Sequence, residues 1–471
     1  MSPWLNRFRE SSITGEIILN SERSNLFYSD IPIFEGEAIS MHEWKDTVCV
    51  VGLWHLGCTY AACLAEIGYR VIGVDENPNV VQKLNEGKAP LFEPGLDDLI
   101  SKGLHSGNLT FQTEIKIGAK NADFVIITYD TPVDEHDRAD ISIILRAAEQ
   151  LKDLHMQGIL VVSSQVPAGT CEQLKKMLHD SVRVAYVPEN LRLGEAIERF
   201  MTPDMIVIGA DDQTVMSQVK RFFSPIETKI VEMDLRSAEM TKHALNSFLA
   251  TSISFANEIG NICDLIGADA LKVASALKSD SRIGAKALIR PGLGFAGGTL
   301  ARDLRTLQKL SRDRGHNTPL IDSVLSVNEE QNKSIVEKLK QLTGPLNGKT
   351  ISVLGLTYKA GTSTLRRSAA VEIVRHLKKE GAIVNAYDPH VSVQEGTMLG
   401  INLSIDPYAS CTNSDALLIV NDMPEVSNLD FSKIRSIMKT PLVFDAQNLI
   451  DPEKVSACGM KYFGIGRGIT S

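Results

Sequence analysis

Short apolar runs alternate with helix-like segments along the first half of the chain, beginning near residue 47. The helix-like segments include Cys58–Ile67 and Asn79–Asn85, in which apolar residues recur at helical spacing. Continuous runs of Val and Ile are typical of parallel strands that helices cover on both faces, so the pattern predicts a parallel α/β sheet. The expected strands are Val48–Gly52, Val71–Asp75, Phe124–Thr128, Ile159–Ser163, Val182–Val187 and Met205–Gly209.

The middle of the chain has helical periodicity without strand-like runs. The pattern predicts helices over Ser237–Ile266, Ala270–Leu277 and Leu304–Leu342. A second α/β set follows Gly344-Pro-Leu-Asn-Gly348, a segment whose glycines and proline are typical of a boundary between elements. Its expected strands are Ile351–Leu354, Ile383–Tyr387, Ala416–Val420 and Leu442–Phe444.

These patterns predict two Rossmann-like, doubly wound parallel-sheet α/β domains joined by a long central helical segment. With 471 residues, the chain is too long for a single core. We expect an extension over 1–46, a first α/β domain over 47–234, a central helical domain over 235–343 and a second α/β domain over 344–471. The extension has no sustained periodicity, so it is either disordered or partly ordered against a neighbour.

Composition narrows the class of protein. The apolar fraction of 43% and the charged fraction of 23% are ordinary for a globular protein. A net charge of -9 argues against a protein that coats nucleic acid, and no apolar run approaches the ~18 residues of a membrane span. The seven cysteines form no CxxC pair or Cys/His cluster, which predicts neither disulfides nor a metal site and favours a reducing cytoplasm.

The first expected strand ends in Gly52-Leu-Trp-His-Leu-Gly57, and Asp75 closes the second strand. A strand, a glycine-bounded turn, a helix and a strand-end acid form a dinucleotide-binding arrangement, in which the acid favours NAD over NADP. Trp54 replaces the usual middle glycine, so either the indole turns away or the cofactor sits slightly shifted. Alternatively, the domain no longer binds a dinucleotide. The expected cofactor residues are Gly52, Trp54, His55, Leu56, Gly57 and Asp75, with His55 as a turn or surface residue rather than a catalytic one.

Several segments resemble the motifs of the UDP-glucose/GDP-mannose dehydrogenase family over residues 47 to about 455. The segment Gly292–Asp303 is similar to a motif that contains GFGGSCFPKD, and Ala238–Asn246 is similar to AELIKYAANAF. The match at Lys88–Gly95 is to the segment after the second strand, and Tyr387–Pro389 matches YDP. The remaining matches are Thr128–Pro132 to VPTP, Ser163–Thr170 to KSTVPVGT, Tyr186–Arg192 to SPEFLREG, Gly355–Ser368 to GLAFKPNTDDIRES and Asp445–Asn448 to DGRN.

The resemblance implies roles for individual residues. Lys242, Asn246 and Asp303 would serve catalysis, because the family's Lys and Asp hold the reacting hydroxyl or a bound water. Lys242 and Asn246 are four residues apart and share one helical face, and apolar Met240, Ala244, Phe248 and Ile253 mark other positions of the helix that can pack. Thr131 and Gln165 would contact NAD. The implied substrate residues are Glu189, Leu191, Arg192, Phe295, Gly297, Lys359 and Arg366.

The chain departs from the family at positions that serve the chemistry. Thr299 stands where the family has its nucleophilic Cys, and a Thr hydroxyl is not ionised near neutral pH without a strong adjacent base. Gln165 replaces the Thr of KSTVP, Leu193 replaces the second Glu of PEFLRE, and Asp130 lies in the loop that resembles VPTP.

We therefore expect an NAD-dependent nucleotide-sugar dehydrogenase that works without covalent catalysis. It either stops after one two-electron oxidation at the sugar C6 hydroxyl or oxidises a hydrated aldehyde to the acid. The competing class is a silent nucleotide-sugar-binding protein or partner subunit. The 6-phosphogluconate-like and hydroxyacid dehydrogenases fit less well, because they lack the second Rossmann-like unit. General similarity favours UDP over GDP, and the resemblance implies a homodimer built on the central helix.

Overall fold

The computed structural model describes residues 46–131, 140–154, 156–178, 182–295 and 299–467. The expected extension therefore lies outside the described residues, apart from Asp46. The first sheet has eight strands in the order β3-β2-β1-β4-β5-β6-β7-β8. They are β1 (Thr47–Val51), β2 (Arg70–Val74), β3 (Leu109–Gln112), β4 (Phe124–Ile127), β5 (Ile159–Val162), β6 (Arg183–Tyr186), β7 (Ile206–Gly209) and β8 (Ile230–Met233).

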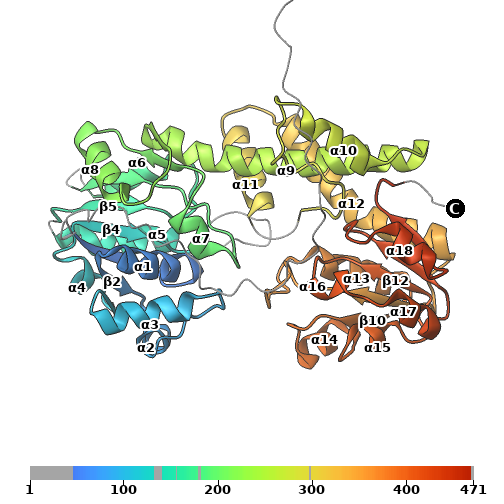
Figure 1. Ribbon diagram of the computed structural model, residues 1–471. Coiled ribbons are helices and arrows are strands. Elements are labelled where there is room, and N and C mark those ends of the chain that lie inside the picture. The colour runs from blue at the N-terminus through green and yellow to red at the C-terminus, as the bar shows by residue number, and fades with distance from the viewer. Residues whose placement is uncertain (1–45, 132–139, 155, 179–181, 296–298, 468–471) are drawn as a thin grey trace, which may run out of the picture. The chain divides into compact units, whose positions relative to one another are not determined.

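Helices cover both faces of this sheet, as the continuous apolar runs predict (Figure 1). Successive strand residues belong to different cores: Val48 and Val50 pack on one face, and Cys49 and Val51 pack on the other. The helices are α1 (His55–Ile67), α2 (Pro78–Asn85), α3 (Leu96–Ser106), α4 (Ile115–Ala119), α5 (Ser142–Leu151), α6 (Thr170–Met177), α7 (Ala196–Met201) and α8 (Gln213–Phe223), with a short 3₁₀ turn at Lys152–Leu154.

The sheet includes features that the apolar pattern missed. Strands β3 and β8 were not predicted, because both are short strands at the edges of the sheet. All neighbours pair in parallel except β6 and β7, which are antiparallel through Tyr186 and Gly209. The expected fully parallel sheet is therefore wrong at this one pairing.

The central segment is helical, as predicted. It consists of α9 (Leu235–Ile266), α10 (Ala270–Ser279), α11 (Leu300–Arg312) and α12 (Pro319–Thr343). The single helix expected over Leu304–Leu342 is wrong, because the chain turns between α11 and α12. Gly315 adopts a left-handed φ of 73°, and Pro319 starts the next helix at a position where its missing N–H has no cost.

The second sheet has the strand order β11-β10-β9-β12-β13-β14, and every neighbouring pair is parallel. This order repeats that of strands β1–β6 in the first sheet. Its strands are β9 (Thr350–Leu354), β10 (Ile383–Tyr387), β11 (Asn402–Leu403), β12 (Ala416–Ile419), β13 (Leu442–Asp445) and β14 (Lys461–Gly464). The short outer strands β11 and β14 were also missed. The helices are α13 (Ala369–Lys379), α14 (Val393–Leu399), α15 (Pro407–Cys411), α16 (Pro424–Ser427), α17 (Phe431–Ile437) and α18 (Pro452–Ala457).

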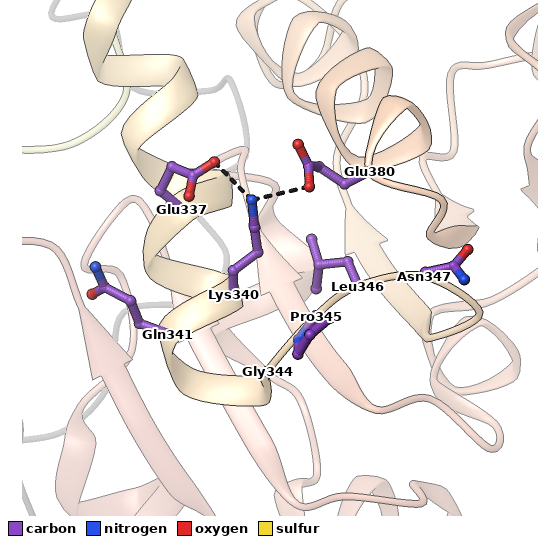
Figure 2. A pocket seen from close by; sticks show the side chains of 8 residues that line it. All are labelled: Glu337, Lys340, Gln341, Gly344, Pro345, Leu346, Asn347 and Glu380. Carbon is purple, nitrogen blue, oxygen red and sulfur yellow. Dashed lines mark hydrogen bonds and ion pairs between the residues drawn. The ribbon is translucent and has the colours of Figure 1, made fainter.

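A surface pocket lies where α12 passes into the segment 344–347 (Figure 2). Lys340 spans it: Nζ lies 3.1 Å from Glu337 Oε1 and 3.0 Å from Glu380 Oε2. Its lining includes none of the residues that the sequence analysis assigns to the site. In open α/β sheets, ligands bind beyond the carboxyl ends of the strands, where the strand order reverses, and here that point lies between β1 and β4.

Candidate active site

The turn after β1 has the backbone geometry that its glycine pattern predicts. Gly52 has a φ of 96°, a left-handed conformation that glycine adopts without strain. A Cβ atom on Gly57 would lie 1.9 Å from the carbonyl oxygen of Gly52, so only glycine lets α1 begin this close to the strand. The Thr128 hydroxyl donates to the same carbonyl at 2.9 Å. The close contact of β1, β4 and α1 therefore requires glycine at position 57.

Asp75 closes the other side of this turn. Its Oδ2 accepts the backbone N–H of Leu53 at 2.8 Å, and its Oδ1 accepts that of Asn77 at 3.0 Å. Asp75 is only half-buried, and a carboxylate offers about four lone-pair positions, so it can accept further donors. Trp54 is the N-cap of α1 and 45% of its surface is exposed. The indole is therefore partly open to solvent at the start of α1.

His55 and Leu56 form the start of α1. The expectation that His55 is a turn or surface residue is only partly right, because its Nε2 lies 2.7 Å from Oε2 of the buried Glu93. Glu93 also accepts the N–H groups of Gly194 at 2.7 Å and Ala196 at 2.8 Å. His55 thus helps hold the loop before α7 against the cofactor turn. Leu56 packs against the first hydrophobic core.

Asp303 lies in the first turn of α11 and is completely buried. Three side chains form hydrogen bonds with its carboxylate. Gln165 Nε2 and His243 Nδ1 reach Oδ1, the latter at 2.6 Å, and Asn246 Nδ2 reaches Oδ2. The structure therefore brings Asn246 and Asp303 together. It also places the amide of Gln165, which the sequence assigns to the cofactor, on this carboxylate.

Lys242 shares its face of α9 with Asn246, but its ammonium points to the residues that follow β6. Nζ lies 2.5 Å from the Glu189 carbonyl oxygen, 3.3 Å from Glu189 Oε1 and 3.4 Å from Asn190 Oδ1. These acceptors can use all three ammonium hydrogens. Glu189 in turn accepts the N–H of Leu191 at 2.9 Å. Lys242 and Asp303, which the resemblance implies as joint ligands of one hydroxyl or water, do not form an ion pair among the described residues.

A second chain of hydrogen bonds reaches Gln165 from the loop after β4. The buried guanidinium of Arg302 donates to both the carbonyl and the hydroxyl oxygen of Thr131 at 3.1 Å. The Thr131 hydroxyl donates to the Gln165 carbonyl at 2.9 Å. Arg302 Nη1 also lies 3.8 Å from Oδ1 of Asp130. Thr131 is therefore buried and engaged within the protein, whereas Asp130 stays at the surface.

Asparagine side chains of α9 and α12 accept backbone N–H groups of the segment before α11. Asn257 of α9 accepts the N–H of Gly292 at 2.8 Å, and Asn328 of α12 accepts that of Phe295 at 2.6 Å. Asn332 accepts the N–H of Gly294 at 3.2 Å. Phe295 is buried as a result. Gly297 lies outside the described residues. Thr299, half-buried, is the N-cap of α11, and its hydroxyl makes no capping bond.

The expected substrate residues after β6 and β9 differ in exposure. Lys359 Nζ lies 3.2 Å from the Leu193 carbonyl and 3.1 Å from Glu195 Oε1, and this contact lowers the pKa of Glu195. Arg192 and Arg366 are exposed, so their guanidinium groups face solvent. Leu191 packs against the first core.

Three sequence models of one family match this chain in order. They describe the NAD binding domain of the UDP-glucose/GDP-mannose dehydrogenase family over residues 46–227, its central domain over 236–330 and its UDP binding domain over 352–452. The chain belongs to the UDP-glucose/GDP-mannose dehydrogenase family. It is thus an NAD-dependent oxidoreductase of the class that acts on CH–OH groups, and the resemblance drawn from the motifs is confirmed.

Relatives within this family match nearly the full length. UDP-glucose 6-dehydrogenase TuaD of Bacillus subtilis is 35% identical over 430 residues, which cover 89% of this chain and 93% of that protein. A UDP-glucose dehydrogenase structure from Pyrobaculum islandicum is 30% identical with a TM-score of 0.83, covering 91% of this chain and 99% of that one. The UDP-N-acetyl-mannosamine dehydrogenase Cap5O of Staphylococcus aureus is 26% identical with a TM-score of 0.74, covering 89% and 98%.

Two observations indicate that the turn of residues 52–57 after β1 is suited to NAD. Gly57 leaves the start of α1 free of a side chain, and the first-turn N–H groups of a helix lack intrahelical acceptors and suit a pyrophosphate. Asp75 keeps acceptor capacity for ribose hydroxyls. Trp54 departs from this fit, because it adds a side chain where the family's middle glycine would let the backbone approach the cofactor.

Two side chains that the fold places in the network around Asp303 were not predicted from the sequence. His243 stands where AELIKYAANAF has Tyr, and Arg302 stands where GFGGSCFPKD has Lys. Both residues differ from the quoted motifs, and this difference is the feature of the sequence that could have pointed to them. Among the described residues no helix is long and apolar enough to cross a membrane. Within those same ranges, His, Cys, Asp and Glu form no cluster suited to a metal ion.

Proposed function

We propose that this protein oxidises the C6 hydroxyl of a UDP-sugar with NAD and without a Cys thioester. The observation that carries the proposal is the local arrangement around α11. Thr299, which stands where the resembled motif has its nucleophilic Cys, is the N-cap of α11, and Asp303, one turn later, contacts Asn246. The match to the family's UDP binding domain and the similarity to a UDP-glucose 6-dehydrogenase and a UDP-N-acetyl-mannosamine dehydrogenase support a UDP-sugar.

NAD, when bound at the turn after β1, supplies the hydride acceptor. Lys242 is the described cation best suited to the reacting oxygen, because its ammonium is nearly buried and can stabilise negative charge that develops there. Glu189 and Asn190 hold the ammonium at the end of β6 until an oxygen of the substrate takes the place of one of them. Lys359 lies near the start of the UDP binding domain and suits a phosphate oxygen.

Cys171 and Cys49 are not suited to replace the missing nucleophile. Cys171 is linked to α9, the helix that carries Lys242, because the backbone N–H of Cys171 donates at 2.7 Å to Glu239 of that helix. Burial raises the pKa of the Cys171 thiol well above its ordinary value and that of Cys49 to about 12. Both thiols therefore stay protonated near neutral pH. Their unpaired state and the five other free thiols support a reducing compartment such as the cytoplasm.

The experiment that tests the proposal is NADH formation over a panel of UDP-, GDP- and TDP-sugars, with the product masses measured alongside. A product that has lost two hydrogens identifies a single oxidation to the carbonyl. A carboxylic acid that forms without a thiol-trappable intermediate identifies oxidation of the hydrated aldehyde. The control is Lys242→Met, which should abolish NADH formation with the preferred sugar. A lack of NADH with every sugar, for the wild type and for Thr299→Cys alike, would overturn the proposal.

One observation favours the competing binding protein: Trp54 occupies the middle glycine position of the NAD turn. Thermal unfolding with each ligand separates the two functions. Saturation at ~100 times the dissociation constant adds about 2.7 kcal/mol of stability. An enzyme should be stabilised by NAD and by the UDP-sugar. A binding protein should respond to the UDP-sugar alone.

The same proposal includes a homodimer built on α9. Phe248, Phe255 and Ile262 recur every seven residues and are 70%, 48% and 46% exposed. The prediction that Phe248 packs is thus wrong within one chain, because the other side of α9 is occupied by α11 and α12. An apolar stripe at heptad spacing is the pattern by which helices pair. We therefore expect a second copy of this chain to cover it.

Light scattering tests this assembly. The wild-type protein should have twice the chain mass, and Phe255→Glu should reduce it to one chain. The matched control is Ile117→Glu, since Ile117 is 58% exposed on α4 and should leave the dimer intact. A wild-type mass of one chain would contradict the dimer.

A further inference from the structure

Departures from the family motifs meet in one network around Asp303. Gln165 and His243 replace Thr and Tyr of the quoted motifs, and both contact the Asp303 carboxylate. Arg302 replaces Lys and joins Gln165 through Thr131. These residues come from separate segments of the sequence. Their contacts with one another indicate that they function as a set, beside the position where the nucleophilic Cys is missing.

His243 has an acceptor in front of each ring nitrogen. Nδ1 lies 2.6 Å from Asp303 Oδ1, and Nε2 lies 2.9 Å from the Val166 carbonyl oxygen. A carbonyl oxygen only accepts, and so does an ionised carboxylate. Both hydrogen bonds therefore form together only if the His243–Asp303 pair holds one proton more than a neutral imidazole and an ionised carboxylate do. This proton lies on Nδ1 or on the carboxyl group.

Both members of the pair are enclosed. His243 is 2% exposed and Asp303 is 0% exposed. The imidazole has no ring nitrogen left for a substrate, so it acts through Asp303 and not on the reacting atoms. Its bond to Val166 ties α9 to the loop after β5, and its bond to Asp303 ties α9 to the first turn of α11. Thr299 is the residue from which this turn starts.

We propose that His243 is a positioning residue that uses a shared proton to lock Asp303 and the start of α11, and that the active conformation requires this proton. The inference rests on the proposed function, since the conformation it describes is that of the oxidising enzyme. Its consequence is a division of roles: Lys242 serves the reacting oxygen, and Asp303 is the anchor of the helix that carries Thr299.

Other titratable groups lie on the elements near the His243–Asp303 pair, and their protonation also affects how kcat depends on pH. Tyr186 and Cys171 do not titrate near neutral pH, because burial raises the pKa of each well above its ordinary value. Burial also raises the pKa of Glu239, although it accepts two backbone N–H groups. Charged and titratable groups on the neighbouring elements are Glu239 and Lys242 of α9, Cys171 of α6, Tyr186 of β6, Glu189 after β6 and Arg302 of α11, and of these Tyr186 interacts electrostatically with Asp303.

The lock should be lost as the pH rises, because the pair then gives up the proton that both hydrogen bonds require. The tests are His243→Asn and His243→Gln. The Asn amide nitrogen takes the place of Nδ1 and can donate to Asp303 at every pH, whereas that of Gln takes the place of Nε2 and can donate to Val166 only. We expect kcat of the wild type to fall as the pH becomes alkaline. His243→Asn should keep most of the wild-type kcat and should not show this alkaline decrease.

His243→Gln should lose kcat by roughly ten- to a hundred-fold, with KM for the UDP-sugar little changed, because a charge-assisted bond to Asp303 is gone. A purely structural histidine would instead lower the unfolding temperature of both variants without altering the pH profile. Persistence of the alkaline decrease in His243→Asn, or equal kcat in the two variants, would overturn the proposal.

A second measurement does not depend on activity and so separates this inference from the proposed function. With ¹⁵N-labelled histidine, the two ring-nitrogen resonances that vanish in His243→Asn belong to His243. We expect a bound proton at Nε2 and a hydrogen shared between Nδ1 and Asp303 near neutral pH. An unprotonated Nε2 there would refute the lock even if the protein forms NADH. A protonated pair in a protein that forms no NADH would leave the lock standing and refute the proposed function instead.

Discussion

Gly57→Ala is the substitution for which the structure gives the clearest magnitude. The new Cβ atom would lie 1.9 Å from the Gly52 carbonyl oxygen and 2.7 Å from the Thr128 hydroxyl oxygen. Ordinary contact begins near 3.4 Å, so the start of α1 must move away from β1 by about 1.5 Å. Overpacking typically costs about 1–3 kcal/mol, and the upper end applies here because the obstacle is backbone.

The displacement also changes the site. The turn of residues 52–57 carries the N–H groups that suit the pyrophosphate, so its movement should weaken NAD binding by more than ten-fold, or about 1.4 kcal/mol. Hydrogen exchange of peptides from β1 and α1 measures the loss of stability, and titration calorimetry measures NAD affinity. The UDP-sugar affinity of the second domain should stay unchanged.

Gly107→Ala is the matched control. Gly107 has a φ of 77°, but a Cβ atom there meets no atom within 4 Å. It should cost only the left-handed strain of about 1–2 kcal/mol and leave NAD affinity intact. Equal NAD affinity in Gly57→Ala and the wild type would refute the reasoning, because it would show that the approach of α1 to β1 does not shape the cofactor turn.

Three further substitutions test other parts of the site. Trp54→Gly should tighten NAD binding several-fold in calorimetry, since it restores backbone access at little cost to the helix cap; weaker binding would show that the indole contributes to the cofactor site. Lys359→Met should raise KM for the UDP-sugar by about ten- to a hundred-fold with kcat nearly unchanged, through loss of a charged phosphate contact. Because Lys359 lowers the pKa of Glu195, the wild-type contact between them should persist at neutral pH and weaken as the pH falls through the lowered value. Lys359→Met should raise the pKa of Glu195 toward its ordinary value, and NMR titration of Glu195 measures this change. Asn332→Ala should lower stability by about 1–3 kcal/mol in denaturant unfolding, because the buried N–H of Gly294 loses its acceptor; an unchanged midpoint would show that the segment before α11 is held without it.

The order of elements could be predicted from the sequence because it depends on local pattern. Continuous apolar runs such as Phe124–Thr128 and Ile159–Ser163 have no polar face, and their short length and Val/Ile content favour strands covered on both sides. The missed strands β3, β8, β11 and β14 lie toward the edges, where burial is less uniform and the run is short. The break between α11 and α12 was also missed, although Gly315 and Pro319 both mark it.

The family, the two α/β domains, the helical centre and the glycine-bounded turn after β1 could be predicted from the amino-acid sequence, because each depends on residues close together in the chain. The surroundings of Asp303 could not be predicted, because they depend on how distant segments fold together. Its partners Gln165 and His243 lie 138 and 60 residues away, and a motif letter does not show which carboxylate an amide or imidazole will reach. The same holds for Lys242, whose ammonium is drawn to Glu189 by the packing of α9 on β6. Local spacing fixes which face of a helix a side chain occupies, but its partner depends on how distant segments pack.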